Sequence, residues 1–279
     1  MTSRKPWGAP QLASPEPPVG AYTIGSINRL PLDEKRIIYA RAIPEALFEK
    51  CAIPAGMFDS AGRDLMHLHC PPGSASAEIM LYHEYGFPDP VLQGHITDTI
   101  NGQIYILFYQ LNNPFSPRFD IDRMPDGRPT LLGTCCRNLD AEIAAFKAGL
   151  APGQIRSGLH LLRDAMRTFE AFVAGLGHNL HFAEPLFYHN AVIFERYGFA
   201  YQRGRRLMER IQRGFSPGGE FLPLLDGRTP FRQPEAANSI RLRSWAIHDG
   251  ILGEPFRNVT MYKQVGVDAK VSTCPDIAW

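Results

Sequence analysis

The sequence lacks the features that a membrane protein or a nucleic-acid-binding protein would show. No stretch of its 279 residues approaches the ~18 consecutive apolar residues that a membrane-spanning helix needs. The 29 Lys and Arg residues are balanced by 28 Asp and Glu residues, so there is no general positive field that would attract a polyanion. We therefore expect a small-molecule substrate and neither a membrane nor a nucleic-acid partner. Nothing in the sequence indicates an oligomeric state.

The sequence also lacks a disulfide framework and a secretion signal. Its five cysteines are an odd number, and Cys135 and Cys136 are adjacent and cannot form an ordinary bridge together. A chain of this length can bury a sizeable core without such bridges. Arg4 and Lys5 are followed by Pro-Trp-Gly-Ala-Pro and not by an apolar run. These observations predict a cytoplasmic protein with reduced thiols.

Proline is frequent at the start of the chain, and elements of regular structure follow. We expect an extended arm over residues 1–30 and a single globular domain over residues 31–279. The clearest strand signals are Ala77–His83 and two runs that flank Asn101-Gly102, a dipeptide typical of a hairpin turn. The run Ile104–Leu111 is almost entirely apolar or aromatic, which favours a central strand.

Helical signals are concentrated in the second half of the chain. Residues 152–175 carry one continuous apolar stripe, and shorter helices are expected over 139–148, 186–197 and 203–215. Short strands are expected near 240–247 and 259–264. Strands that precede helices in this way predict an α+β fold, with a central antiparallel or mixed sheet and packed helices.

Two stretches in the helical half deserve comparison with a known family. The first is "LAPGQIRSGLHLL" (150–162), in which a Gly-containing turn leads into a long helix. The second is "NAVIFERYGF" (190–199), a helix that ends in Tyr-Gly-Phe. A turn of the first kind presents free backbone N–H groups and the positive end of a helix dipole, which together can bind a pyrophosphate. From about Leu150 to Gly204 the chain resembles the GNAT superfamily of N-acyltransferases.

The resemblance implies a GNAT-like fold, an acyl-CoA-dependent transferase activity and binding of acetyl-CoA or another acyl-CoA. It implies that Gln154, Arg156, Gly158 and Asn190 contact this cofactor. The position that often holds a proton-donating tyrosine in the family is Phe194 here. Tyr188 and His189, which lead the resembling helix, are therefore the candidate catalytic residues, because an imidazole titrates near neutrality.

Two other functions remain open from the sequence. His178, His181 and Glu184 are spaced by three residues and would share one face of a helix, where they could bind a metal ion. In an extended segment the same spacing would place successive side chains on opposite faces. The third hypothesis is a non-catalytic ligand-binding protein with a transferase-like fold. In that case we expect His160 to fill the space beside Gly158.

Overall fold

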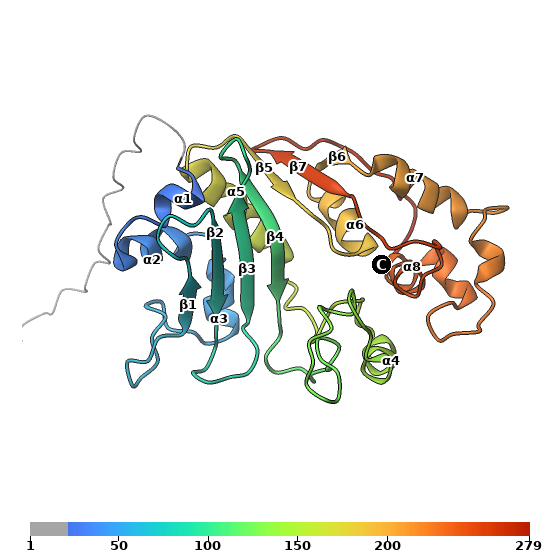
Figure 1. Ribbon diagram of the computed structural model, residues 1–279, viewed down its shortest axis with the longest axis horizontal. Coiled ribbons are helices and arrows are strands. Elements are labelled where there is room, and N and C mark those ends of the chain that lie inside the picture. The colour runs from blue at the N-terminus through green and yellow to red at the C-terminus, as the bar shows by residue number, and fades with distance from the viewer. Residues whose placement is uncertain (1–21) are drawn as a thin grey trace, which may run out of the picture.

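The structure, a computed structural model, describes residues 22–279, and within them the fold is α+β (Figure 1). A mixed sheet of seven strands runs through the described part in the order β1-β2-β3-β4-β5-β7-β6. All neighbouring strands are antiparallel except β4 and β5, which are parallel. The strands are β1 (Met66–His69), β2 (Ser76–Leu81), β3 (Leu92–Asp98), β4 (Ile104–Leu111), β5 (Leu180–Ala183), β6 (Ala200–Arg203) and β7 (Thr260–Gln264). The predicted fold class and mixed sheet are thus confirmed.

The first four strands form an antiparallel meander with one buried face. Buried and partly buried residues alternate along β2 and along the start of β3, as expected for strands with one face on the core. The β3–β4 hairpin turns at Gly102, which has a φ of +75°, and the Thr99 N–H donates to the Gln103 carbonyl. The hairpin predicted at Asn101-Gly102 is therefore confirmed.

Strands β4 and β5 pair over a short distance and then diverge. Their register covers only Ile104–Ile106 against His181–Ala183, although β4 continues to Leu111. On its other side, β4 pairs Ile106 with Ile96 and Phe108 with His95, which leaves Leu107 as an extra, bulged residue. A bulge bends its strand. The bend at Leu107 therefore coincides with the point at which β4 leaves β5.

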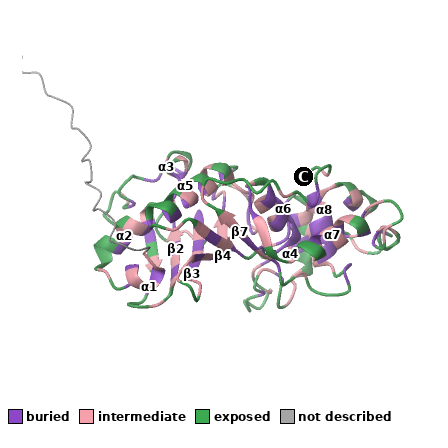
Figure 2. Cartoon of the chain, turned by 90° about the horizontal axis from the view of Figure 1, so that it is seen from above, coloured by how far each residue is buried: buried purple, intermediate pink, exposed green. Residues whose placement is uncertain are grey.

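Some helices cover the sheet, and others continue the fold beyond strand β6. They are α1 (Ile24–Ile27), α2 (Leu32–Ala40), α3 (Glu45–Lys50), α4 (Leu139–Lys147), α5 (Leu162–Gly175), α6 (Tyr188–Arg196), α7 (Arg205–Gly214) and α8 (Ile240–His248). Helix α5 links β4 to β5 and packs behind the sheet together with α3 (Figures 1 and 2). Buried residues are concentrated between the strands and these helices, and between α6 and α8 (Figure 2).

An insertion over residues 112–161, which contains α4, separates β4 from α5 and packs against α8. Its anchors are polar. The indole Nε1 of Trp245 donates to the Leu150 carbonyl at 2.8 Å, and the Glu142 carboxylate lies 2.9 Å from His248 Nε2. The Arg137 guanidinium contacts both Glu142 and Asp249. We refer to the contacts among Arg137, Glu142, His248 and Asp249 as the clamp. The insertion therefore joins the end of β4 to the C-terminal helices.

Three expectations about individual elements were wrong. Residues 240–247 form helix α8 and not a strand, and the Ser239 hydroxyl caps this helix by accepting from the Leu242 N–H. The long helix begins at Leu162 and not at residue 152, because Gly153 turns the chain with a φ of +81° and the following residues form a loop. Residues 24–27 form the buried helix α1, so the expected arm does not extend to residue 30, and residues 1–21 lie outside the described part. Among residues 22–279, no helix is long and apolar enough to cross a membrane.

Candidate functional site

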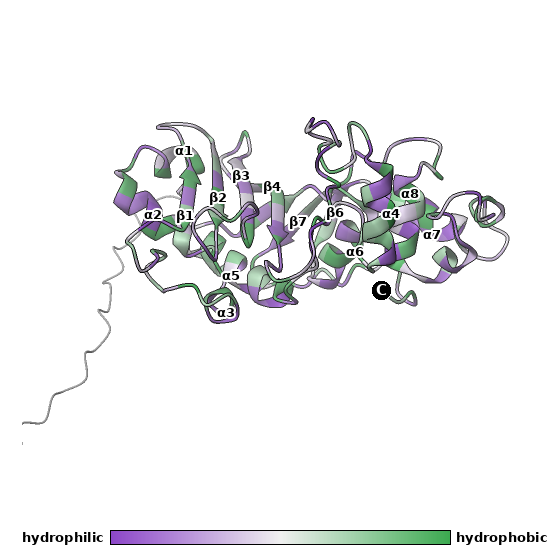
Figure 3. Cartoon of the chain, turned by 90° about the horizontal axis from the view of Figure 1, so that it is seen from below, coloured by the Kyte–Doolittle hydropathy of each residue, from purple (hydrophilic) through white to green (hydrophobic). Residues whose placement is uncertain are grey.

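The edge at which β4 and β5 diverge is also the edge at which helix α5 begins. In a strand–helix–strand unit with parallel strands, the helix N-terminus lies at the carboxyl ends of the strands, where ligands of such sheets usually bind. The loop before α5 is tied to the end of β4, because the Asn113 N–H donates to the Ser157 carbonyl at 2.9 Å. Figure 3 views the molecule from this edge and shows α5 beside the strands and α4 of the insertion close to α6 and α8.

The loop before α5 presents unpaired backbone N–H groups. Among residues 22–279, the amides of residues 158–164 have no hydrogen-bond acceptor, and the first bonded amide of the helix is that of Ala165. No side chain caps the helix. A Cβ atom added to Gly158 would meet nothing within 4 Å, and His160 is exposed. The expected filling of this space by His160 is therefore not found, and the N-terminal end of α5 is open to an anion.

Two of the side chains expected to bind the cofactor contact the protein itself. Arg156 is buried and forms an ion pair with Asp89 at 2.8 Å, and Arg118 pairs with the same carboxylate at 3.1 Å. The Gln154 amide oxygen accepts from the Ala151 N–H at 2.7 Å. The side chains of both residues therefore hold the loop through contacts within the protein and do not point to its open side.

Asn190 and the two expected catalytic residues lie at the start of α6, where Tyr188 and His189 are buried and Asn190 is partly exposed. Asn190 Oδ1 caps the helix by accepting from the Phe187 N–H at 3.1 Å, while its Nδ2 donates to His189 Nε2 at 3.2 Å. His189 Nδ1 therefore carries the ring proton and donates to the Ser244 hydroxyl at 2.8 Å. Burial, with a smaller contribution from the neighbouring His248, lowers the pKa of His189 to about 3.

Tyr188 is buried as well. Its side chain is 1 % exposed, and its hydroxyl has no hydrogen-bond partner among residues 22–279. Burial is the main reason that its pKa is raised, and the Cys274 thiol adds to this effect. Neither Tyr188 nor His189 reaches the open edge beside α5.

A different pair of side chains lies where β4 and β5 part. The Glu184 N–H donates to the Ile106 carbonyl directly beyond the last paired residues of the two strands. The Glu184 carboxylate is exposed, and the Tyr105 hydroxyl donates to it at 3.0 Å. The pKa of Tyr105 is raised mainly by burial, and the Glu184 carboxylate raises it further. Sequence reasoning missed Tyr105 because its partner lies 79 positions away and no local pattern links them.

Aromatic rings continue from Tyr105 across the same face of the sheet. Tyr105 pairs in register with Phe182, which pairs with Tyr262. The ring centroids of the first two are 6.2 Å apart, and those of the second two are 6.5 Å apart. All three are partly exposed, so the Glu184 carboxylate lies at one end of an accessible aromatic row.

The three side chains of the metal hypothesis do not come together. Strand β5 is extended, so His181 points into the core between the rings of Phe169 and Phe199, whereas Glu184 lies on the other face with Tyr105. His178 Nε2 lies 2.8 Å from the Tyr22 carbonyl. Within residues 22–279 there is no group of three or more His, Cys, Asp or Glu side chains that could hold a metal ion.

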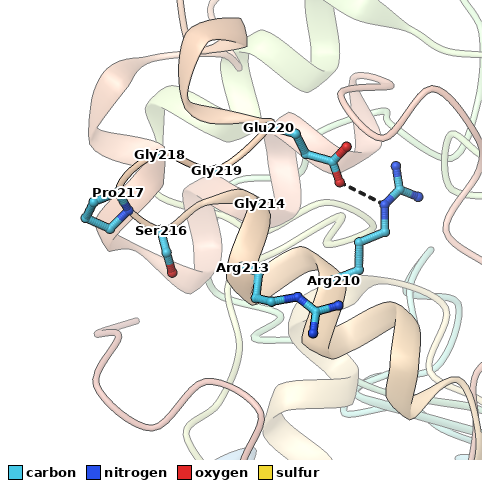
Figure 4. A pocket seen from close by; sticks show the side chains of 8 residues that line it. All are labelled: Arg210, Arg213, Gly214, Ser216, Pro217, Gly218, Gly219 and Glu220. Carbon is cyan, nitrogen blue, oxygen red and sulfur yellow. Dashed lines mark hydrogen bonds and ion pairs between the residues drawn. The ribbon is translucent and has the colours of Figure 1, made fainter.

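Helix α7 lies beyond β6, on the side of the molecule away from α1 and α2, whereas α5 lies behind β3 and β4 (Figure 1). Two surface hollows of about 470 and 430 Å³ lie beside α7, and Figure 4 shows the first. Arg210 separates them, because its guanidinium pairs with Glu220 on one side and with Glu254 on the other. Arg213 has no carboxylate partner among residues 22–279.

No family model, no curated protein and no solved structure matches the chain. Its chemistry must therefore be inferred from the open edge itself. The unpaired amides before α5 are suited to an anion, and the carboxylate and the phenol where β4 and β5 part are suited to proton transfer.

Proposed function

We propose that the chain is an acyl-CoA-dependent N-acyltransferase similar to the GNAT superfamily. One observation carries the proposal. The sole parallel neighbours among the described strands, β4 and β5, diverge at the Leu107 bulge, and the unpaired amides before α5 lie at the same edge. The sequence resemblance assigns its pyrophosphate loop to this same segment.

In this proposal the backbone, and not the expected side chains, binds the cofactor. The amides of residues 158–164 donate to the pyrophosphate, and the absence of a side chain at Gly158 allows a close approach. Arg156 acts indirectly, because its buried ion pair with Asp89 fixes the loop. Leu107 and Leu186, which are 37 % and 40 % exposed, offer apolar surface beside the two diverging strands for the arm of the cofactor.

Glu184 is the proposed proton acceptor. An amine must lose a proton as it attacks the acyl carbon, which bound acyl-CoA supplies as a thioester. The Glu184 carboxylate is exposed at the point of divergence, and the Tyr105 hydroxyl orients it. His189 is unsuited to this role, because it is buried and its pKa is about 3.

The test uses the same substitution in the loop before α5 and at the last residue of α5. Gly158→Glu places a negative charge at the unpaired amides, while Gly175→Glu adds the same charge at the far end of the helix. A Cβ atom meets nothing within 4 Å at either position, and neither position has a positive φ. Acetyl-CoA at a hundred times its Kd should stabilise the wild type by about 2.7 kcal/mol, which raises Tm by a few degrees.

We expect Gly175→Glu to keep this shift in Tm and Gly158→Glu to lose it, while both variants remain folded without ligand. If acetyl-CoA leaves the Tm of the wild type unchanged, or if both variants keep the shift, the proposal is wrong.

A further inference from the structure

Cys135 and Cys136 are accessible thiols on the insertion, whereas the other three cysteines are buried. The Cys136 thiol donates to the Pro129 carbonyl at 3.8 Å. Desolvation in the turn raises the pKa of Cys136, and the charge and hydrogen bond of the Cys135 thiol raise it further. Two adjacent thiols in one accessible turn are the arrangement of an attacking and a resolving cysteine.

The turn that carries the two thiols has an unusual backbone. Leu131, Leu132 and Gly133 have consecutive φ values of +51°, +58° and +84°. Leucine disfavours this left-handed region, so the surroundings must hold the turn in place. Thr130 does so from within: its carbonyl accepts from the Cys135 N–H and its hydroxyl accepts from the Gly133 N–H, both at 3.2 Å.

The turn packs closely against the clamp between the insertion and α8. A Cβ atom at Gly133 would lie 2.6 Å from Glu142 Oε1 and 2.9 Å from His248 Nε2, so only glycine fits there. Arg137, which directly follows Cys136, contacts both Glu142 and Asp249. A change in backbone direction at residues 135–136 is therefore transmitted directly to the guanidinium that holds the clamp.

We propose that Cys135 and Cys136 are a reversible oxidation site whose oxidant is a hydroperoxide. The Cys135 thiolate attacks one peroxide oxygen and the O–O bond breaks, so that this oxygen stays on sulfur as a sulfenic acid and the other leaves, with a proton, as an alcohol or as water. The Cys136 thiol then attacks this sulfur and expels water, so that two thiols and one peroxide give a disulfide, an alcohol and water. This site is independent of the proposed acyl transfer.

The disulfide between adjacent residues is strained and is therefore easily reduced. Consecutive Cα atoms lie about 3.8 Å apart, below the roughly 4.4–6.8 Å of ordinary disulfides. Strained, exposed disulfides have the higher reduction potentials typical of labile bonds. The strain acts on the peptide between Cys135 and Cys136, which leads into Arg137, so oxidation loosens the contacts of Arg137 with Glu142 and Asp249.

The covalent step is tested by mass spectrometry of the full-length protein after treatment with hydrogen peroxide. Trypsin cuts after Arg123 and Arg137 but not between Arg128 and Pro129, which leaves both thiols in one peptide. We expect this peptide to become lighter by two hydrogen atoms and to recover its mass with a dithiol reductant. The peptides that contain Cys51 and Cys70 serve as internal controls and should stay unmodified.

Cys135→Ser and Cys136→Ser should each abolish the loss of two hydrogen atoms. Added oxygen on a single sulfur without loss of hydrogen, or disulfides between two chains, would overturn the proposal. The coupling is tested by hydrogen exchange over residues 137–150. We expect faster exchange after oxidation and recovery on reduction, with no change in peroxide-treated Cys136→Ser. Unchanged exchange in protein that contains the disulfide would refute the coupling.

Discussion

Two buried imidazoles should make the native state sensitive to acid at a pH where carboxylates remain ionised. Burial lowers the pKa of His181 to about 4 and that of His189 to about 3, from an ordinary value of 6.5. Below pH 6.5 these two histidines therefore bind protons in the unfolded chain but remain neutral in the folded chain. The contribution of these residues to stability is full at neutral pH and is lost as the pH falls toward the folded values.

The magnitude follows from the size of the shifts. At about pH 5, which is about 1.5 units below the unfolded pKa, each histidine removes about 2 kcal/mol from the free energy of unfolding. His181 is the better one to replace, because its Nδ1 has no partner among residues 22–279 and its ring lies between two phenylalanine rings. Between about pH 7.5 and about pH 5, we expect the free energy of unfolding of His181→Leu to fall by about 2 kcal/mol less than that of the wild type.

Urea unfolding at the two pH values measures this difference, and the exposed His160 provides the control. His160→Gln should follow the wild type at both pH values. If His181→Leu lost as much stability in acid as the wild type, His181 could not be a buried neutral imidazole, and the reasoning from burial would be refuted.

Two further predictions concern the clamp and the chemistry. Gly133→Ala should lower the free energy of unfolding by about 3 kcal/mol, because the new methyl group meets Glu142 and φ is +84°. Gly127→Ala, with a φ of +85° and open space, should cost only about 1 kcal/mol, and equal losses in urea unfolding would contradict the clamp geometry. Glu184→Gln should lower kcat for acetylation of a primary-amine panel by roughly 100-fold or more without changing the Kd for acetyl-CoA. Tyr105→Phe should lower kcat by about tenfold. An unchanged kcat in Glu184→Gln would show that Glu184 is not the proton acceptor.

The hairpin and the body of α5 were predicted from local signals in the sequence, although the start of α5 was placed ten residues too early. The apolar stripe of α5 and the Asn101-Gly102 turn depend on residues close together in the chain. Helix α8 was mistaken for a strand because most of its residues are buried, including Arg243 and Ser244, so it shows no single apolar stripe. A helix buried all round and a buried strand look alike in a short apolar run.

The site was harder to predict because its parts meet across long separations. Arg156 was expected at the cofactor, but its partner Asp89 lies 67 positions earlier, and no local pattern signals this buried pair. Glu184 was considered only as a metal ligand, since its contact with Tyr105 depends on the pairing of β4 with β5. The loop itself could be located, because a Gly-containing turn before a long helix is a local feature. The cytoplasmic location and the acyl-CoA dependence remain predictions.

The most direct test of the central claim is hydrogen exchange with and without acetyl-CoA. The amides of residues 158–164 have no acceptor among residues 22–279, so they should exchange rapidly in the free protein. Saturating acetyl-CoA should slow their exchange, while the bonded turn at residues 99–103 should stay unchanged. Protection of residues 158–164 would support acyl-CoA binding at the diverging strands. Unchanged exchange there under saturation, or protection confined to α7, would contradict it.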